Sequence, residues 1–286
     1  MYLSRISLRP DIADTQLPLL LQDRKGYGLH RLFWDLFSDG SGGKQARNFL
    51  FREEIAGEQL LNPGKRKAAP IYYVLSHQEP KNEHPLFSIE SKSYRPKLSS
   101  GDRLGFKLRV NPVVRRDGKR HDIVMDAQQS WLRDQLQAMD LGCSGTKNAL
   151  KAHLLDHAGN EQISAWGKII EGGVFSQKLE QRLGRLDILE WAIKTVVELR
   201  VRKWWQEKSE RLGFDVAVDE DGLPILESMA YQKHHLPEKA QHAGFNSLDL
   251  SGELIVRDVA AFERLLFEGI GPSKAFGCGL MLIRRL

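Results

Sequence analysis

The sequence has few cysteines and no long apolar run, and each absence excludes a class of protein. Its 286 residues include two cysteines, Cys143 and Cys278, which are too few for a disulfide framework. No apolar stretch approaches the roughly 20 residues of a membrane span; candidates such as residues 17–21 are far shorter. Residues 1–8 have the pattern of a strand and lack the features of an export signal. We therefore expect a cytoplasmic protein that does not enter a membrane.

Proline is also absent from residues 125–212, where strand signals are nearly absent too. Within this stretch, residues 127–138, 146–156 and 179–211 fit helices. On both sides of it, short β-type segments alternate with single helices. The pattern predicts an α+β protein, with antiparallel sheets that carry helices on one face and an all-helical stretch in between.

The individual elements follow from apolar spacing. A helix is expected over residues 27–37, because Leu29, Leu32 and Leu36 recur at helical intervals. A second helix should begin after Asp258, a good N-cap, and end at Gly269. Strands are expected at residues 2–8, 48–53, 71–76, 86–91, 103–110, 214–218, 223–225 and 248–256.

Charge is distributed unevenly along an otherwise ordinary composition, with 41% hydrophobic and 28% charged residues and a net charge of +5. Residues 101–124 hold seven basic and three acidic side chains. In the strand predicted at residues 103–110, leucine and phenylalanine alternate with Arg103, Lys107 and Arg109, so one face is core and the other basic. Residues 115–120 predict a basic hairpin with Asp117-Gly118 at its tip. A polyanion is the natural partner.

Tyr27 and His30 lie three residues apart near the start of the first predicted helix, so their side chains are neighbours. Histidine transfers protons near neutral pH, and RNA supplies its own nucleophile in the 2′-hydroxyl. Tyrosine can donate to a phosphate oxygen or orient the ribose. Spacing alone leaves a purely surface role for the pair open.

A glycine-rich segment precedes the C-terminal strand and contains Gly269, Gly271, Gly277 and Gly279 together with Lys274. Such a backbone can approach a ligand closely, and the lysine suits a phosphate. The segment follows a helix and opens a strand, the reverse of the dinucleotide fingerprint, and it lacks the Gly-Lys-Ser/Thr of a P-loop. A long turn without a ligand is the alternative.

Five motifs in order make the sequence similar to a known family. It resembles the CRISPR repeat endoribonuclease of type I-E systems, the CasE subunit of the Cascade complex, over residues 1–124 and 200–286. The motifs are the opening Met1-Tyr2-Leu3-Ser4, the helix start Tyr27-Gly28-Leu29-His30, residues 46–51 (Ala-Arg-Asn-Phe-Leu-Phe), the strand end Arg109-Val110-Asn111-Pro112, and the glycine-rich segment.

The resemblance implies two ferredoxin-like domains in tandem, residues 1–100 with the catalytic pair and residues 101–286 for RNA binding, interrupted by a helical insertion at about 126–199. It implies cleavage of a repeat hairpin at the 3′ base of its stem without metal or cofactor, leaving a 2′,3′-cyclic phosphate and a 5′-hydroxyl. The catalytic residues would be His30 and Tyr27. The enzyme would keep its product and join other Cascade subunits, next to the backbone subunit nearest the 3′ end of the CRISPR RNA. The RNA contacts would come from Arg109, Arg115, Arg116, Lys119, Arg120, Gly271, Lys274, Gly277 and Gly279.

Two departures from the family leave alternatives open. Some relatives carry a lysine one to two turns after the histidine, where this sequence offers only Arg31. The helical insertion is absent from compact members, and its His153 and His157, with Cys143 upstream, form either a weak metal site or a solvated helix face. The competing functions are a non-catalytic subunit that binds an RNA hairpin and a metal-dependent nuclease that uses the insertion.

Overall fold

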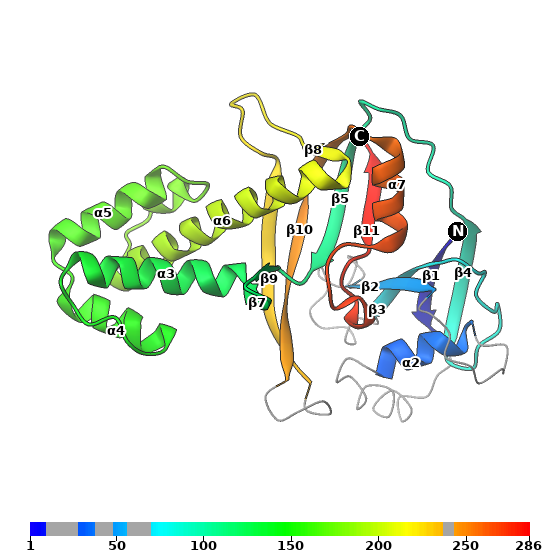
Figure 1. Cartoon of the computed structure of the whole chain (residues 1–286), viewed down its shortest axis with the longest axis horizontal. Helices are drawn as coiled ribbons and strands as arrows, with labels where there is room; N and C mark the ends of the chain where they lie inside the picture. The colour runs from blue at the N-terminus through cyan, green and yellow to red at the C-terminus, as the bar shows by residue number, and fades with distance from the viewer. Residues whose placement is uncertain (10–27, 38–47, 56–69, 237–242) are drawn as a thin grey trace. The chain divides into compact units, whose positions relative to one another are not determined.

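The computed structural model describes residues 1–9, 28–37, 48–55, 70–236 and 243–286. The chain forms two compact units (Figure 1). Unit 1 comprises residues 1–111 and 210–286, and unit 2 comprises residues 112–209. Within the described parts of the chain, no helix combines the length and the apolar character needed to cross a membrane.

The first sheet of unit 1 has four antiparallel strands in the order β2-β3-β1-β4. The first strand is therefore central, and a helix connects it to the edge strand β2. The described residues 77–86, which join β3 to β4, contain no helix. The elements are β1 (Tyr2–Leu8), α2 (Gly28–Asp35), β2 (Phe49–Ile55), β3 (Pro70–Ser76) and β4 (Phe87–Ser93).

Aromatic side chains fill the space between α2 and this sheet. Phe33 of α2 is fully buried, and its ring centroid lies 5.1 Å from that of Phe51 and 5.2 Å from that of Tyr72. The spacing of apolar residues that predicted the helix thus places its apolar side on the sheet. The other face of β2 presents Leu50, which is buried with Leu75 and Leu280.

The second sheet of unit 1 repeats the same strand order. Its path is β11-β5-β10-β8, and β9 also pairs with β10, on the same side as β8. The first strand, β5, therefore again lies between the last strand and the one before it. A helix, α7, connects β10 to β11. The elements are β5 (Arg103–Val110), β8 (Phe214–Val216), β9 (Leu226–His235), β10 (Gly244–Val256), α7 (Val259–Glu268) and β11 (Met281–Arg285).

Local signals predicted several of these elements correctly. In β5, Leu104, Phe106, Leu108 and Val110 are buried, while Arg103 and Lys107 are exposed. The Asp258 carboxylate accepts a hydrogen bond of 3.0 Å from the Ala261 amide and caps α7. Gly269 ends that helix with φ +74°, a conformation that glycine adopts without a steric penalty.

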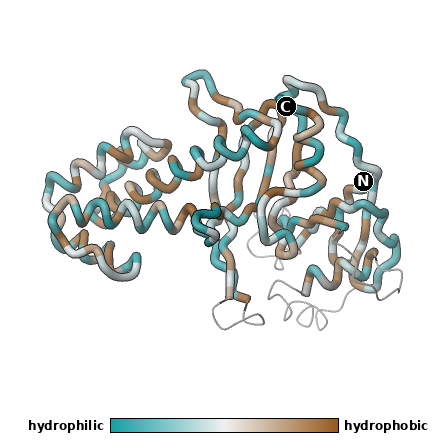
Figure 2. Tube along the Cα trace, in the orientation of Figure 1, coloured by the Kyte–Doolittle hydropathy of each residue, from teal (hydrophilic) through white to brown (hydrophobic). Residues whose placement is uncertain are grey.

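The strand predicted at residues 223–225 is wrong in position. Pro224 makes only an isolated bridge to Val218, and the strand β9 begins at Leu226. In β9 only Leu226 is buried, and the C-terminal half of the strand is hydrophilic (Figure 2). Because β9 lacks an alternation of apolar and polar residues, only its pairing with β10 defines it.

Unit 2 opens with the hairpin of β6 (Val113–Arg116) and β7 (Lys119–Asp122) and is otherwise helical. Its core surrounds Trp166, which is fully buried and donates a 3.0 Å hydrogen bond to Gln135. The helix predicted at 179–211 is interrupted, because η2 ends at Glu180 and α6 begins only at Arg185. The amide of Gly184 donates a hydrogen bond of 3.0 Å to the Asp187 carboxylate at the start of α6. The helices are α3 (Ile123–Ala138), α4 (Lys147–His157), α5 (Asn160–Glu171), η2 (Ser176–Glu180) and α6 (Arg185–Leu212).

Candidate nucleic-acid interface

His30 lies in α2 with its imidazole inside an aromatic cluster. The residue is 6% exposed, so His30 does not have the purely surface role that spacing alone left open. Its ring centroid lies 5.3 Å from that of Phe49, 5.9 Å from that of Trp34 and 6.4 Å from that of Phe51. These three aromatic rings restrict the orientation of the imidazole. A side chain that transfers a proton must be positioned in this way. Tyr27 lies outside the described residues, as does the side chain of Arg31.

The glycine-rich loop, residues 269–280, contacts β2, the strand against which His30 packs. A Cβ atom on Gly277 would lie 3.3 Å from the Phe51 ring, and one on Gly269 would lie 2.8 Å from the Leu50 side chain. Phe51 therefore connects the loop to the His30 cluster. The glycines at 269, 271, 277 and 279 all have φ between +72° and +94°, so the loop needs glycine at these positions.

Hydrogen bonds fasten the same loop to the end of β5. The Gly279 amide donates 2.8 Å to the carbonyl of Arg109, and the Asn111 amide group donates 2.8 Å to the hydroxyl of Ser273. The ammonium of Lys274 donates a hydrogen bond to the backbone carbonyl of Glu268, the last residue of α7. Residues 48–51, 109–111 and 269–280, which belong to three of the sequence motifs, are thus brought together within unit 1.

Arg109 is held in place by a residue that the sequence did not single out. Its Nε and Nη2 each donate 2.9 Å to the Asp249 carboxylate on β10, and this bidentate hydrogen bonding raises the pKa of Arg109. Asp249 also lies 3.7 Å from Nη2 of the buried Arg52 on β2. Glu253 of β10 likewise accepts a hydrogen bond of 2.7 Å from Nε of Arg103. These two carboxylates partly neutralise the basic face predicted for β5.

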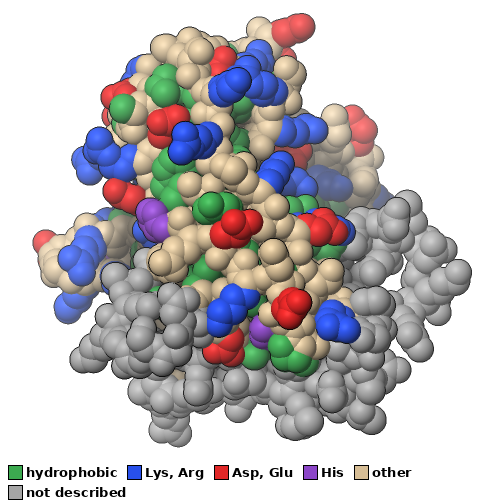
Figure 3. All heavy atoms as spheres, turned by 90° about the vertical axis from the view of Figure 1, so that its right-hand side faces the viewer, with side chains coloured by type: hydrophobic (Ala, Val, Ile, Leu, Met, Phe, Trp, Pro, Cys, Tyr) green, Lys and Arg blue, Asp and Glu red, His purple; other side chains and the backbone are tan. Residues whose placement is uncertain are grey.

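Among the described residues, no single basic patch covers the face of the molecule shown in Figure 3. There, lysine and arginine side chains alternate with aspartate and glutamate. We therefore expect phosphates to bind at particular basic segments of the chain rather than across this whole face.

The basic hairpin of unit 2 forms as the sequence predicted. Asp117 and Gly118 at its tip have φ of +49° and +73°, both in the left-handed region that a two-residue hairpin turn requires. Arg115 pairs with Arg120, and Arg116 with Lys119, and all four side chains are exposed. Like charges directly opposite one another destabilise a hairpin, so a bound polyanion would stabilise it.

One carboxylate partly offsets this charge. Arg116 lies 3.3 Å from Asp126 of α3. Across the described ranges, Arg115, Lys119 and Arg120 form no ion pair. Three cationic groups on this hairpin are therefore available to phosphates.

The alternative metal site in the insertion has two imidazoles in contact. The rings of His153 and His157 lie 4.7 Å apart, and Nδ1 of His157 lies 2.9 Å from the His153 carbonyl. Cys143 is exposed. Within the part of the chain that the structure describes, no three His, Cys, Asp or Glu side chains gather as ligands for a metal ion.

Known proteins of the same fold bind RNA. The CRISPR endoribonuclease Cse3 bound to a 19-nucleotide RNA is 18% identical, with a TM-score of 0.59 over 99% of this chain and 100% of its own. Thermus thermophilus Cse3, bound to an RNA representing a pre-cleavage complex, is also 18% identical, with a TM-score of 0.57 over 99% and 98%. These matches show that the two sheets are tandem ferredoxin-like domains, as expected.

A comparison of the sequence with known families agrees with the structural matches. No curated protein sequence matches the chain. The family described as CRISPR associated protein matches residues 1–170 and 175–285, which is nearly the whole chain. With that match and the Cse3 fold, the resemblance found in the sequence motifs is confirmed, and the chain belongs to the CRISPR-associated protein family.

Proposed function

We propose that this chain processes CRISPR precursor RNA: it binds the repeat hairpin and cuts at the 3′ base of the stem without a metal ion. The observation that carries the proposal is the position of His30. Its imidazole is fixed against Phe51, and the glycine-rich loop packs on the same ring. A proton-transfer group and the glycine-rich loop thus pack against the same residue of β2.

The reaction that fits is attack by the 2′-hydroxyl oxygen on the adjacent phosphorus. The bond from phosphorus to the 5′ oxygen breaks, so the products are a 2′,3′-cyclic phosphate and a 5′-hydroxyl, and no water is consumed. One proton leaves the 2′-hydroxyl and one joins the 5′ oxygen. His30 moves one of these protons, and Tyr27 assists at the phosphate or the ribose.

The RNA would be held mainly through its phosphates and its shape, the mode in which A-form helices are recognised. Residues 101–286, interrupted by the helical insertion at about 126–199, supply this grip, and residues 1–100 supply the catalytic pair. After cutting, the enzyme keeps the mature RNA and joins Cascade beside the backbone subunit nearest its 3′ end. The contacting residues are Arg109, Arg115, Arg116, Lys119, Arg120, Gly271, Lys274, Gly277 and Gly279.

A second candidate function is favoured by the burial of His30. A histidine that is 6% exposed among Trp34, Phe49 and Phe51 also suits a packing role, in which case the chain binds the hairpin without cutting it. The two functions differ in whether RNA is cleaved and in what the imidazole does.

Cleavage of a labelled repeat hairpin in EDTA tests the proposal. We expect cutting that is unaffected by the chelator and a product end that carries a cyclic phosphate. A hairpin with a 2′-deoxy nucleotide at the cut should stay intact. Cutting that requires a divalent metal would contradict the mechanism, and tight binding without any cutting would establish the non-catalytic alternative.

His30→Phe separates catalysis from packing, because a phenyl ring keeps the aromatic cluster filled but can neither accept nor donate the proton that cleavage requires. We expect cleavage to fall by about 10²- to 10⁴-fold while hairpin affinity stays within about twofold. His84→Ala is the matched control, since His84 also stacks on a phenylalanine of the first sheet, Phe87, at 4.9 Å. If His30→Phe cuts as fast as the parent, the assignment is wrong.

A further inference from the structure

Three rings from three elements form a continuous stack on the second sheet. The imidazole of His234 on β9 lies 4.6 Å from the ring of Phe245 on β10, with 13° between their planes. Phe245 in turn lies 5.1 Å from Phe276, at 32°. Phe276 belongs to η3 (Lys274–Phe276) in the glycine-rich loop. We call these three residues the ring stack.

The ring stack lies on the polar face of the sheet rather than in its core. His234 and Phe245 are directly paired across β9 and β10, and Phe245 shares its side of β10 with Ser247, Asp249 and Ser251 by strand alternation. The residues between them, such as Leu248 and Leu250, are buried on the opposite face. All three rings are partly exposed.

The imidazole of His234 is held in place, and its surroundings disfavour its charged form. Its Nε2 lies 2.7 Å from the Ser247 hydroxyl. Burial, and then the charge of Arg109, lower the pKa of His234, while Asp249 opposes them. The imidazole is held nearly parallel to the ring of Phe245 and so presents a flat surface.

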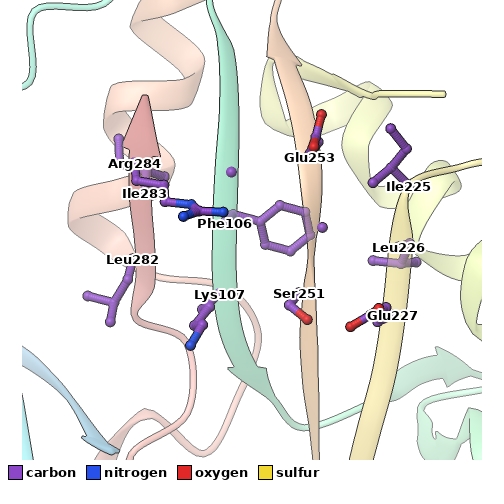
Figure 4. Close-up of a pocket in the computed structure, with 12 residues that line it drawn as sticks. Phe106, Lys107, Ile225, Leu226, Glu227, Ser251, Glu253, Leu282, Ile283 and Arg284 are labelled. Atoms are coloured by element: carbon purple, nitrogen blue, oxygen red, sulfur yellow. The ribbon is translucent and has the colours of Figure 1, made fainter. Parts of the chain in front are cut away.

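Cationic groups lie along the same face. A concavity of about 610 Å³ on this sheet is lined by Lys107 and Arg284, and also by Glu227 and Glu253; Figure 4 draws these side chains. Lys107 is exposed and, among the described residues, has no carboxylate partner. Backbone phosphates running along this face would therefore meet the ammonium of Lys107 beyond the ring stack.

We propose that the ring stack binds an unpaired base of the RNA that flanks the hairpin, a site that rests on the proposed function and adds a single-strand contact to it. In RNA-binding domains built on a small sheet, aromatic rings that are accessible on the sheet stack unpaired bases, and the three rings of the stack are partly exposed on such a sheet. Stacking on an aromatic ring tolerates any base, because every base has a flat π-face. The contact would tie the flanking strand to the loop that carries Lys274.

Three RNAs and four variants test the site. The RNAs are the blunt repeat hairpin, the hairpin with an unpaired 5′ extension, and the hairpin with an unpaired 3′ extension that is protected by a 2′-deoxy nucleotide at the cut. In His234→Ala and Phe245→Ala we expect affinity for one extended RNA to fall about 5- to 100-fold, with affinity for the blunt hairpin unchanged. His234→Phe should restore the affinity, and His84→Ala should affect none of the RNAs.

A fluorescent base reports the stacking directly. With 2-aminopurine at successive unpaired positions, one position should be quenched on binding to the parent chain and not on binding to His234→Ala. Equal affinity of parent and variants for every RNA would overturn the site. So would an equal loss for blunt and extended RNAs, which indicates a structural effect. Failure of the parent chain to bind the blunt hairpin would instead contradict the proposed function.

Discussion

Arg109 and Asp249 are joined by two parallel hydrogen bonds of 2.9 Å across the neighbouring strands β5 and β10. The same carboxylate lies 3.7 Å from Arg52 of the first sheet. Arg52 is buried and also bonds Glu54. One acidic side chain thus compensates two arginines and connects the two sheets of unit 1.

Asp249→Ala should destabilise the protein strongly, because it leaves two poorly exposed guanidinium groups without their common partner. We expect a loss of about 3 kcal/mol in the free energy of unfolding, measured by urea titration. Glu253→Ala is the control on the same strand: its partner Arg103 is half exposed, so that change should cost about 0.5 kcal/mol. Equal costs for the two variants would contradict the role assigned to Asp249.

Gly279→Ala should cost more than Gly101→Ala, although the two glycines have similar φ values of +94° and +90°. A Cβ on Gly279 would lie 2.9 Å from the carbonyl oxygen of Ile270, whereas one on Gly101 would meet nothing within 4 Å. Both variants bear about 1 kcal/mol of backbone strain, and crowding adds about 1–3 kcal/mol at Gly279. Unfolding midpoints in urea measure the difference in stability. Equal midpoints would show that the loop moves to accommodate the added Cβ without a loss of stability.

The two cysteines should react at very different rates. Cys278 is fully buried, and burial raises the pKa of its thiol to about 12, so thiolate is scarce at pH 8. Cys143 is exposed. A chromogenic thiol reagent should therefore titrate one thiol quickly in the native protein and two after unfolding. Rapid reaction of native Cys143→Ser would show that the glycine-rich loop opens readily.

The basic hairpin should govern the salt dependence of RNA binding. Replacing Arg115, Lys119 or Arg120 by alanine should lower the slope of log affinity against log salt by about 1 for each phosphate that is no longer neutralised. Arg103→Ala is the control, because Arg103 is already paired with Glu253. Binding of the repeat hairpin at a series of salt concentrations gives the slopes, and unchanged slopes in the hairpin variants would remove these residues from the RNA-binding surface.

The sequence by itself determined the elements whose signals are local. The alternation in β5, the Asp258 cap and Gly269 stop of α7, and the Asp117-Gly118 hairpin each depend on residues a few positions apart, so their pattern is complete within a short window. The ordered motifs also pointed to the correct family, because the residues of each motif and their order can be read along the chain.

Only the tertiary structure decided which of these pieces meet. β9 is polar and exists through its pairing with β10, and the ring stack combines His234, Phe245 and Phe276 from three elements with no common motif. Asp249 became important through Arg52, which is far away along the chain. Such contacts arise from the strand order of the two sheets, and a pattern read along one segment carries no information about its neighbour in space.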